Sequence, residues 1–228
     1  EMARGKEHLS LQFFAEDGMA IHKIYLTPQS HVEAYKALVE KYKSEEQNTK
    51  LEISVFAEAP RYKNDHEVDL AGFQKSWEEL KDTHHFFGLL KKHNISRSQA
   101  LRLAPSAYYA DKIEKEKIVS MLEKVARQEL PIMVFVGNPG NIQIHTGKIN
   151  KTLWHQQWFN IMDPDFNLHL NMDDVANCWV VRKPTEDGIV TSIECFDKDD
   201  ELIVQFFGKR KPGIPEIKEW QEVVAQLQ

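Results

Sequence analysis

The chain has 228 residues, of which 42% are hydrophobic and 28% charged, the composition of an ordinary globular protein with room for a sizeable core. No apolar run approaches the ~20 residues of a membrane-spanning helix, so we do not expect a membrane-embedded protein. A formal net charge of -6 provides no basic field, which argues against general nucleic-acid binding. Two cysteines far apart in sequence exclude a disulfide framework and fit a reducing cytoplasm.

The first 43 residues predict a hairpin followed by a helix. Short apolar strands at Leu9–Phe14 and Ala20–Leu26 flank Asp17 and Gly18, and Asp-Gly supplies the positive φ that a tight turn needs. An amphipathic helix follows, because apolar residues recur at helical spacing at Val32, Tyr35, Leu38 and Val39. A polar linker over residues 44–68 then separates this part from the rest.

Residues 69–130 show a helical pattern throughout, broken by Pro105. The apolar positions of this pattern are the candidate core of the helices. They are Phe73, Trp77, Leu80, Phe87, Leu90, Ile118, Leu122 and Val125.

After Pro131 the pattern becomes extended, and turn residues separate seven short strand-like segments. These are PIMVFVG, NIQIHTGKI, LWHQQWFNIMD, FNLHL, CWVVRKP, GIVTSIECFD and ELIVQFFGKR. Successive strands with no long helix between them imply an antiparallel sheet. A last amphipathic helix carries Ile217, Trp220, Val223, Val224 and Leu227. The predicted class is α+β, an antiparallel β-meander sheet packed with helices.

An internal similarity links the two hairpins. The segment beginning at Ser10 aligns without gaps on the segment beginning at Ser192, and an aromatic amphipathic helix follows each. We therefore expect residues 1–43 to be the last hairpin and helix of an incomplete first repeat, and residues 69–228 to be one complete repeat. The alternative is that any two hairpins resemble each other.

The sequence contains no phosphate loop, nucleophile elbow or HExxH helix, so no catalytic residue is assigned. The adjacent pair His84 and His85 is the notable feature. With Asp82 as N-cap, both lie in the first turn of a helix, whose positive end disfavours a protonated imidazole and so favours the neutral form that ligates iron. Phe87 and Gly88 share the face of His84, leaving room for a flat macrocycle. The alternative is a histidine that caps or packs at a helix start.

Three basic residues are placed where they could meet the two carboxylates of a haem. Arg97 follows one helix after the histidine pair, Lys183 ends a predicted strand, and Arg210 closes the last strand. For each of them alone, a solvated surface charge is the more common role.

Five segments closely resemble the HemS/ChuS/PhuS family of cytoplasmic haem-trafficking and haem-degrading proteins of Gram-negative bacteria. They are DTHHFFGLL, MVFVGNPGNIQIHTG, FNLHL, WVVRKPTEDGIVTSIECFD and QFFGKRKPGIPE. The resemblance covers roughly the C-terminal two thirds of a member, and the family is an internal duplication. It implies haem (iron protoporphyrin IX) as the cofactor.

The resemblance also implies site residues. It assigns the iron ligand to His84 and leaves His85 at a variable position. The positions that match the lining of the family's haem pocket are Arg97, Lys183, Gln205, Phe207 and Arg210. Some members carry tyrosine where this chain has Phe207, so a hydroxyl is lost here. The family's distal arginine belongs to the first repeat, in a stretch that this chain lacks. For a true fragment, we expect the sixth position on the iron to be open, filled by water or taken by a group of a neighbouring molecule.

Three functions follow as expectations. The first is a haem-binding protein that accepts imported haem and delivers it for iron release, with an inner-membrane haem importer and a haem oxygenase as partners. The second is an oxygenase that cleaves bound haem with reductant and O2 to a bilin, CO and iron. The third is a fragment with an incomplete pocket that forms a homodimer through an exposed sheet edge.

Overall fold

The structure, a computed structural model, describes residues 2–3, 6–48, 52–54 and 60–227. The chain divides into two units, residues 1–59 with 138–141, and residues 60–137 with 142–228. Residues 49–51 and 55–59 of the predicted linker lie outside the described residues. The division into segments 1–43, 44–68 and 69–228 stays a prediction.

The first unit contains the predicted hairpin and helix. Gly18 has a φ of +84° in the hairpin turn, as the Asp-Gly sequence predicts. The hydroxyl of Tyr35 donates to the carbonyl of Ser10 at 3.1 Å, which ties the helix to the hairpin. The elements of this unit are β1 (Met2–Ala3), β2 (Lys6–Glu7), β3 (Ser10–Phe14), β4 (Ala20–Tyr25) and α1 (Val32–Tyr42).

The helices of the second unit largely follow the predicted pattern. They are the 3-10 helix η1 (Asp65–Glu67), α2 (Leu70–Glu78), α3 (His85–His93), α4 (Arg97–Arg102), α5 (Glu116–Arg127) and α6 (Lys218–Ala225). The prediction of helix throughout residues 69–130 is wrong at β5 (Ala110–Ile113), which is a strand because it pairs with β11. None of the helices in the described part of the chain has the length and apolar character that a bilayer crossing requires.

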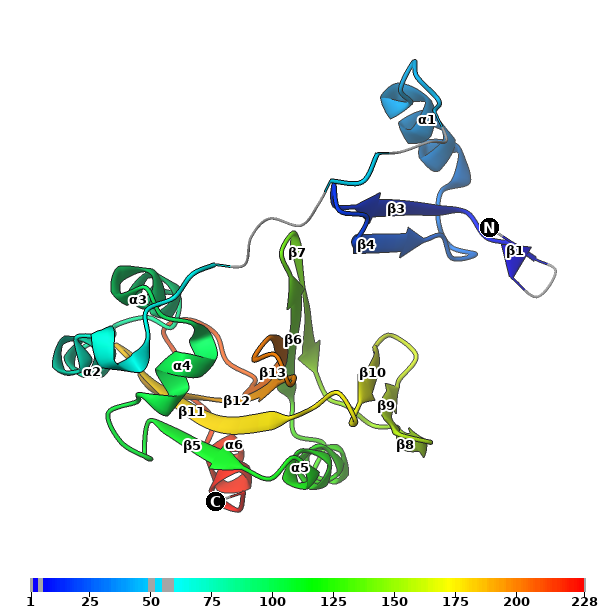
Figure 1. The fold of residues 1–228 in the computed structure, drawn as a ribbon. Helices are drawn as coiled ribbons and strands as arrows, with labels where there is room; N and C mark the ends of the chain where they lie inside the picture. The colour runs from blue at the N-terminus through cyan, green and yellow to red at the C-terminus, as the bar shows by residue number, and fades with distance from the viewer. Residues whose placement is uncertain (1, 4–5, 49–51, 55–59, 228) are drawn as a thin grey trace. The chain divides into compact units, whose positions relative to one another are not determined.

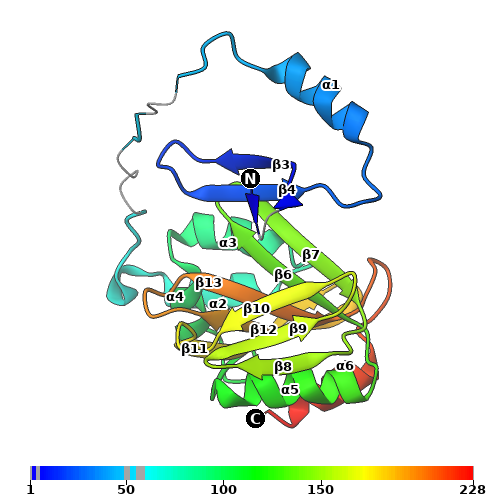
Figure 2. The ribbon, with the colours of Figure 1, turned by 90° about the vertical axis from the view of Figure 1, so that its right-hand side faces the viewer.

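The strands after Pro131 are antiparallel, as predicted, and form two sheets. They are β6 (Ile132–Asn138), β7 (Asn141–Gly147), β8 (Thr152–His155), β9 (Trp158–Met162), β10 (Asn167–Asn171), β11 (Asn177–Thr185), β12 (Gly188–Phe196) and β13 (Leu202–Gly208). The larger sheet has the order β5-β11-β12-β13-β6-β7 and the smaller one β10-β9-β8, whose strands lie side by side in Figure 2.

Two details of the predicted meander are wrong. The segment Leu153–Asp163 is two strands, because Gln156 adopts a left-handed φ of 52° and turns the chain. The larger sheet is also not one continuous meander, since β13 pairs with β6 through Phe206 and Val134 and so returns to the first hairpin of the series.

The larger sheet separates two groups of helices, and alternation along its strands assigns side chains to each face. Figure 1 shows α5 and α6 on one side of β11 and β12 and α2, α3 and α4 on the other. Ile193 and Phe206 pack in the core with α5 and α6, while Val181 packs with Phe86 of α3. Glu194, Gln205 and Phe207 therefore lie on the face opposite the main core.

The predicted helical core is largely correct. Buried as expected are Phe73, Trp77, Leu80, Leu90, Ile118, Leu122 and Val125. The prediction that Phe87 is a core residue is wrong, because its side chain is 63% exposed, whereas Phe86 is 1% exposed. Helix α3 instead directs the side chain of Phe86 into the core.

The hairpins β3–β4 and β12–β13 have the same register. When Ser10 is aligned with Ser192, the pairs Ser10↔Tyr25 and Ser192↔Phe207 coincide, as do the other cross-strand pairs. The register shift after Phe13 matches the one after Cys195, and both turns contain a residue of positive φ. An internal repeat predicts this match, although the repeat itself stays a prediction.

Candidate functional site

A cavity of about 340 Å³ opens on the sheet face opposite the main core. The loop before α3, the start of α4, strands β6 and β11–β13 and the segment after β13 border it. Of the residues predicted for the site, the cavity is lined by His84, Arg97, Lys183, Gln205, Phe207 and Arg210. Phe87 and Gly88 are not among its lining residues.

His84 occupies the N-cap position of α3, one residue before the helix begins at His85. Asp82 is therefore not the N-cap that we predicted. Its Oδ1 accepts the backbone N–H of His84 at 2.8 Å, a turn that competes with the helix and delays its start.

The imidazole of His84 is oriented by the same carboxylate. Oδ1 of Asp82 lies 2.7 Å from Nδ1 of His84, and a neutral ring that donates from Nδ1 keeps its lone pair on Nε2. No described residue bonds to that Nε2, and the side chain is 89% exposed. The hydrogen bond from the backbone of His84 is the main cause that lowers the pKa of Asp82, which keeps it ionised. The arrangement is that of a metal-ligating histidine held by a carboxylate.

Arg97 and Lys183, predicted as cations for a ligand, share a buried counter-ion. Glu194 Oε2 accepts from Nε of Arg97 at 2.6 Å, and Glu194 Oε1 accepts from Nη2 of Arg97 and from Nζ of Lys183, both at 2.8 Å. Burial lowers the pKa of Lys183 to about 8, against the opposing charge of Glu194. Burial also acts to raise the pKa of Glu194, but the two cations hold it well below its usual range.

Phe86 joins this ion cluster to the helix that follows His84. Its ring centroid lies 5.3 Å from Cζ of Arg97 and 4.7 Å from Nζ of Lys183, within the range of cation–π interactions. The inward position of Phe86 thus packs α3 against both cations.

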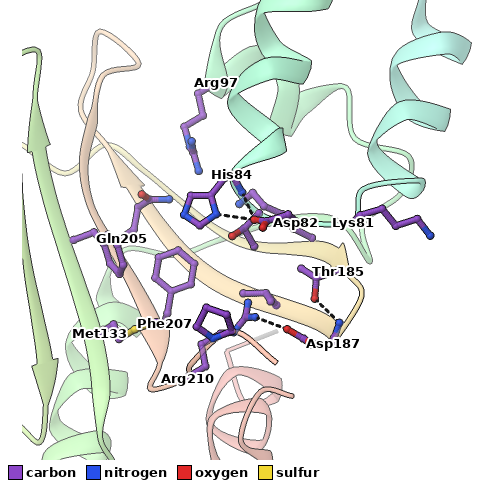
Figure 3. Close-up of a pocket in the computed structure, with 15 residues that line it drawn as sticks. Lys81, Asp82, His84, Arg97, Met133, Thr185, Asp187, Gln205, Phe207 and Arg210 are labelled. Atoms are coloured by element: carbon purple, nitrogen blue, oxygen red, sulfur yellow. Dashed lines mark hydrogen bonds and ion pairs between the residues drawn. The ribbon is translucent and has the colours of Figure 1, made fainter. Parts of the chain in front are cut away.

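A second ion pair lies at the other end of the cavity. Nη2 of Arg210 contacts Oδ2 of Asp187 at 3.3 Å, and the same oxygen accepts the backbone N–H of Gly213 at 2.9 Å. Nε of Arg210 is buried without a hydrogen-bond partner among the described residues. Figure 3 shows Arg97 and Arg210 at opposite ends, with His84 and Phe207 between them.

Apart from Phe207, the apolar wall of the cavity was not predicted. Met133, Phe135, Val190 and Pro212 contribute to it, and the rings of Phe135 and Phe207 meet edge to face at 5.1 Å. Alternation on β6 could have located Met133 and Phe135, because their neighbours Ile132 and Val134 are core residues.

In the part of the chain that the structure describes, no three His, Cys, Asp or Glu side chains converge on a point that could hold a metal ion. A single oriented imidazole therefore suits a metal that brings most of its own ligands. The fold and the cavity define an α+β protein with one free imidazole nitrogen beside an apolar, cation-bordered space.

Comparison with known proteins gives the family. The family model described as "Haemin-degrading HemS.ChuX domain" matches residues 1–42 and 94–227. The chain belongs to this family. Residues 43–93, which include His84, lie outside the matched segments.

Individual relatives match the whole chain. It is 37% identical to the hemin transport protein HemS of Yersinia enterocolitica over 227 residues, spanning 100% of this chain and 64% of HemS. The crystal structure of holo-PhuS, a heme-binding protein from Pseudomonas aeruginosa, matches with a TM-score of 0.95 and 46% identity over 100% of this chain and 65% of PhuS. ChuS, described as an E. coli heme oxygenase, matches with a TM-score of 0.88 and 36% identity over 100% of this chain and 66% of ChuS.

Proposed function

We propose that this chain binds haem, with Nε2 of His84 as the protein ligand to the iron. The observation that carries the proposal is the Asp82-oriented imidazole, whose free nitrogen lies at an apolar cavity bordered by cations. The porphyrin supplies four nitrogens, so one protein imidazole is sufficient.

The remaining lining residues fit the shape and charge of haem. The rings of Phe135 and Phe207 offer an apolar surface to a flat macrocycle. The cations Arg97, Lys183 and Arg210 suit its propionates, because a guanidinium or ammonium forms charge-assisted hydrogen bonds with a carboxylate. Gln205 adds a polar group on the same wall.

We propose that the protein acts in the cytoplasm, where it accepts imported haem from an inner-membrane importer. It then delivers the haem to an acceptor such as a haem oxygenase, so that the iron can be released. The names of the relatives HemS, a hemin transport protein, and PhuS, a heme-binding protein, support this choice. The 89% exposure of the His84 side chain supports reversible ligation, because an acceptor can reach the ligand.

Degradation of haem by reductant and O2 is the second candidate, and one observation favours it. ChuS, with which this chain shares its fold at a TM-score of 0.88, is described as a heme oxygenase. Carriage and degradation use the same imidazole, so only a reaction with reductant separates them.

Titration with haemin, followed by the Soret absorbance, tests the binding proposal. We expect His84→Ala to weaken binding by about tenfold or more and to change the spectrum, because the iron loses its protein ligand. His85→Ala is the matched control and should titrate like the unsubstituted protein. An unchanged titration of His84→Ala would exclude His84 as the ligand.

Addition of ascorbate in air, with catalase present to remove peroxide, separates the two functions. A Soret band that only shifts on reduction supports carriage. Loss of the band together with the appearance of a bilin spectrum supports degradation.

A further inference from the structure

We propose that Glu194 is a positioning residue that holds Arg97 and Lys183 from behind, so that together they present one net positive charge to a single carboxylate of the ligand. This inference rests on the proposed function and deepens it, because it assigns how the carboxylate edge of haem is recognised.

The position of Glu194 makes it a support and not a direct contact. Its side chain is 0% exposed and does not line the cavity, whereas Arg97 and Lys183 both do. Glu194 engages the Nε and Nη2 edge of the guanidinium, which leaves Nη1 of Arg97 for a ligand.

The carboxylate of Glu194 is itself fixed. Its Oε1 accepts from the hydroxyl of Ser192 at 2.9 Å and from the amide of Gln205 at 3.0 Å, in addition to Arg97 and Lys183. Four donors on one oxygen leave this group little freedom, so the two cations that it holds are oriented before a ligand arrives. Such preorganisation lowers the entropic cost of binding.

The charges of the cluster select one carboxylate. Arg97 and Lys183 carry two positive charges and Glu194 one negative charge, and all three are largely buried, so one further anion neutralises the group. Arg210 differs, because Asp187 already pairs with it. Of these two ion pairs, only the one at the Arg97 end of the cavity therefore keeps a net positive charge, and one propionate of haem should lie there.

The groups around the Lys183 amine come from several elements. They are Glu194 and Ser192 of β12, Arg97 of α4 and the ring of Phe86 of α3. Glu194 is the anion among them. Replacing its charge would leave Arg97 without its two-point anchor and Lys183 as an uncompensated buried cation.

The test compares haemin with haemin dimethyl ester, whose carboxylates are blocked. Both ligands are titrated into the unsubstituted protein, Glu194→Gln and the control Glu222→Gln, which changes an exposed acid on α6. We expect Glu194→Gln to lose about tenfold or more in affinity for haemin and less than about threefold for the ester, because only haemin carries the carboxylate. Glu222→Gln should bind both ligands as the unsubstituted protein does.

Equal losses of affinity for the two ligands would show that Glu194 acts only on the fold. No loss of affinity would show that Glu194 is not needed. Either result overturns the inference while haem binding stands. Binding of neither ligand by the unsubstituted protein would overturn the proposed function and this inference together. Should Glu194→Gln not fold, Ser192→Ala removes one donor to Glu194, and a smaller loss for haemin alone, about threefold, is expected.

Discussion

The carboxylate of Asp82 contacts His84 at two places, the backbone N–H at 2.8 Å and the ring nitrogen Nδ1 at 2.7 Å. One side chain therefore sets both where α3 begins and which ring nitrogen of His84 keeps a free lone pair.

Asp82→Asn should weaken haemin binding by about 10–100-fold, because the amide keeps an oxygen for the backbone but removes the charge that supports the imidazole. Haemin titration of this variant beside Glu222→Gln measures the effect. An affinity equal to that of the control would mean that the ring needs no carboxylate partner.

Phe86→Ala should lower the free energy of unfolding by about 3–5 kcal/mol, because a fully buried aromatic side chain leaves a cavity. Phe87→Ala is the matched control, with an expected change within about 1 kcal/mol, because its ring is exposed. Urea denaturation measures both. A similar loss for the two variants would contradict the inward position of Phe86.

Lys183 should make stability depend on alkaline pH. Its folded pKa of about 8 lies below its ordinary value of 10.5, so between these values the unfolded chain holds more protons at this amine and stability rises with pH. Below pH 8 both states are protonated and the group adds no pH dependence. The rise is at most about 3 kcal/mol.

Denaturation from pH 7.5 to 10 checks this against Lys183→Met, which should lack the rise. Lys112→Met, which removes an exposed amine, is the control and should follow the unsubstituted protein. A constant difference in unfolding free energy between Lys183→Met and the unsubstituted protein over this range would contradict a lowered pKa of Lys183.

Gly208→Ala should destabilise the protein by about 1–3 kcal/mol, because the added methyl would lie 2.6 Å from the ring of Trp220, which packs α6 on the sheet. Gly88→Ala meets no atom within 4 Å and should stabilise α3 by about 0.5–1 kcal/mol. Thermal unfolding measures both. Because Gly88 does not line the cavity, haemin binding by Gly88→Ala should be unchanged.

Most elements follow from local sequence, because periodicity and turn chemistry act over a few residues. The Asp-Gly hairpin and the amphipathic helix of Trp220 were predicted on that basis. Strand β5 could not be predicted in this way, because its sequence ADKI has no apolar alternation. It becomes a strand only by pairing with β11. The turn at Gln156 carries no Gly or Asn that could reveal it.

In the candidate site too, some residues could be predicted from the sequence and others depended on the packing of the chain. His84 and the three cations were predicted from their residue types and from the family resemblance, and they line one cavity. Glu194 was missed, although an acid in the middle of an apolar strand requires a buried counter-charge. The choice between Phe86 and Phe87 also depended on how the helix lies on the sheet. The sequence alone does not show which of two neighbouring aromatic residues faces the core.

The shared register of the two hairpins has a consequence for their chemistry. Glu194 and Gln205 face each other across β12–β13, and the same register places Gln12 opposite Lys23 across β3–β4. One hairpin thus carries an acid opposite an amide and the other an amide opposite an amine, so the facing pair is anionic in the first and cationic in the second. In β12 this position holds two cations through the carboxylate of Glu194, whereas Gln12 at the aligned position of β3 has no carboxylate with which to hold a cation.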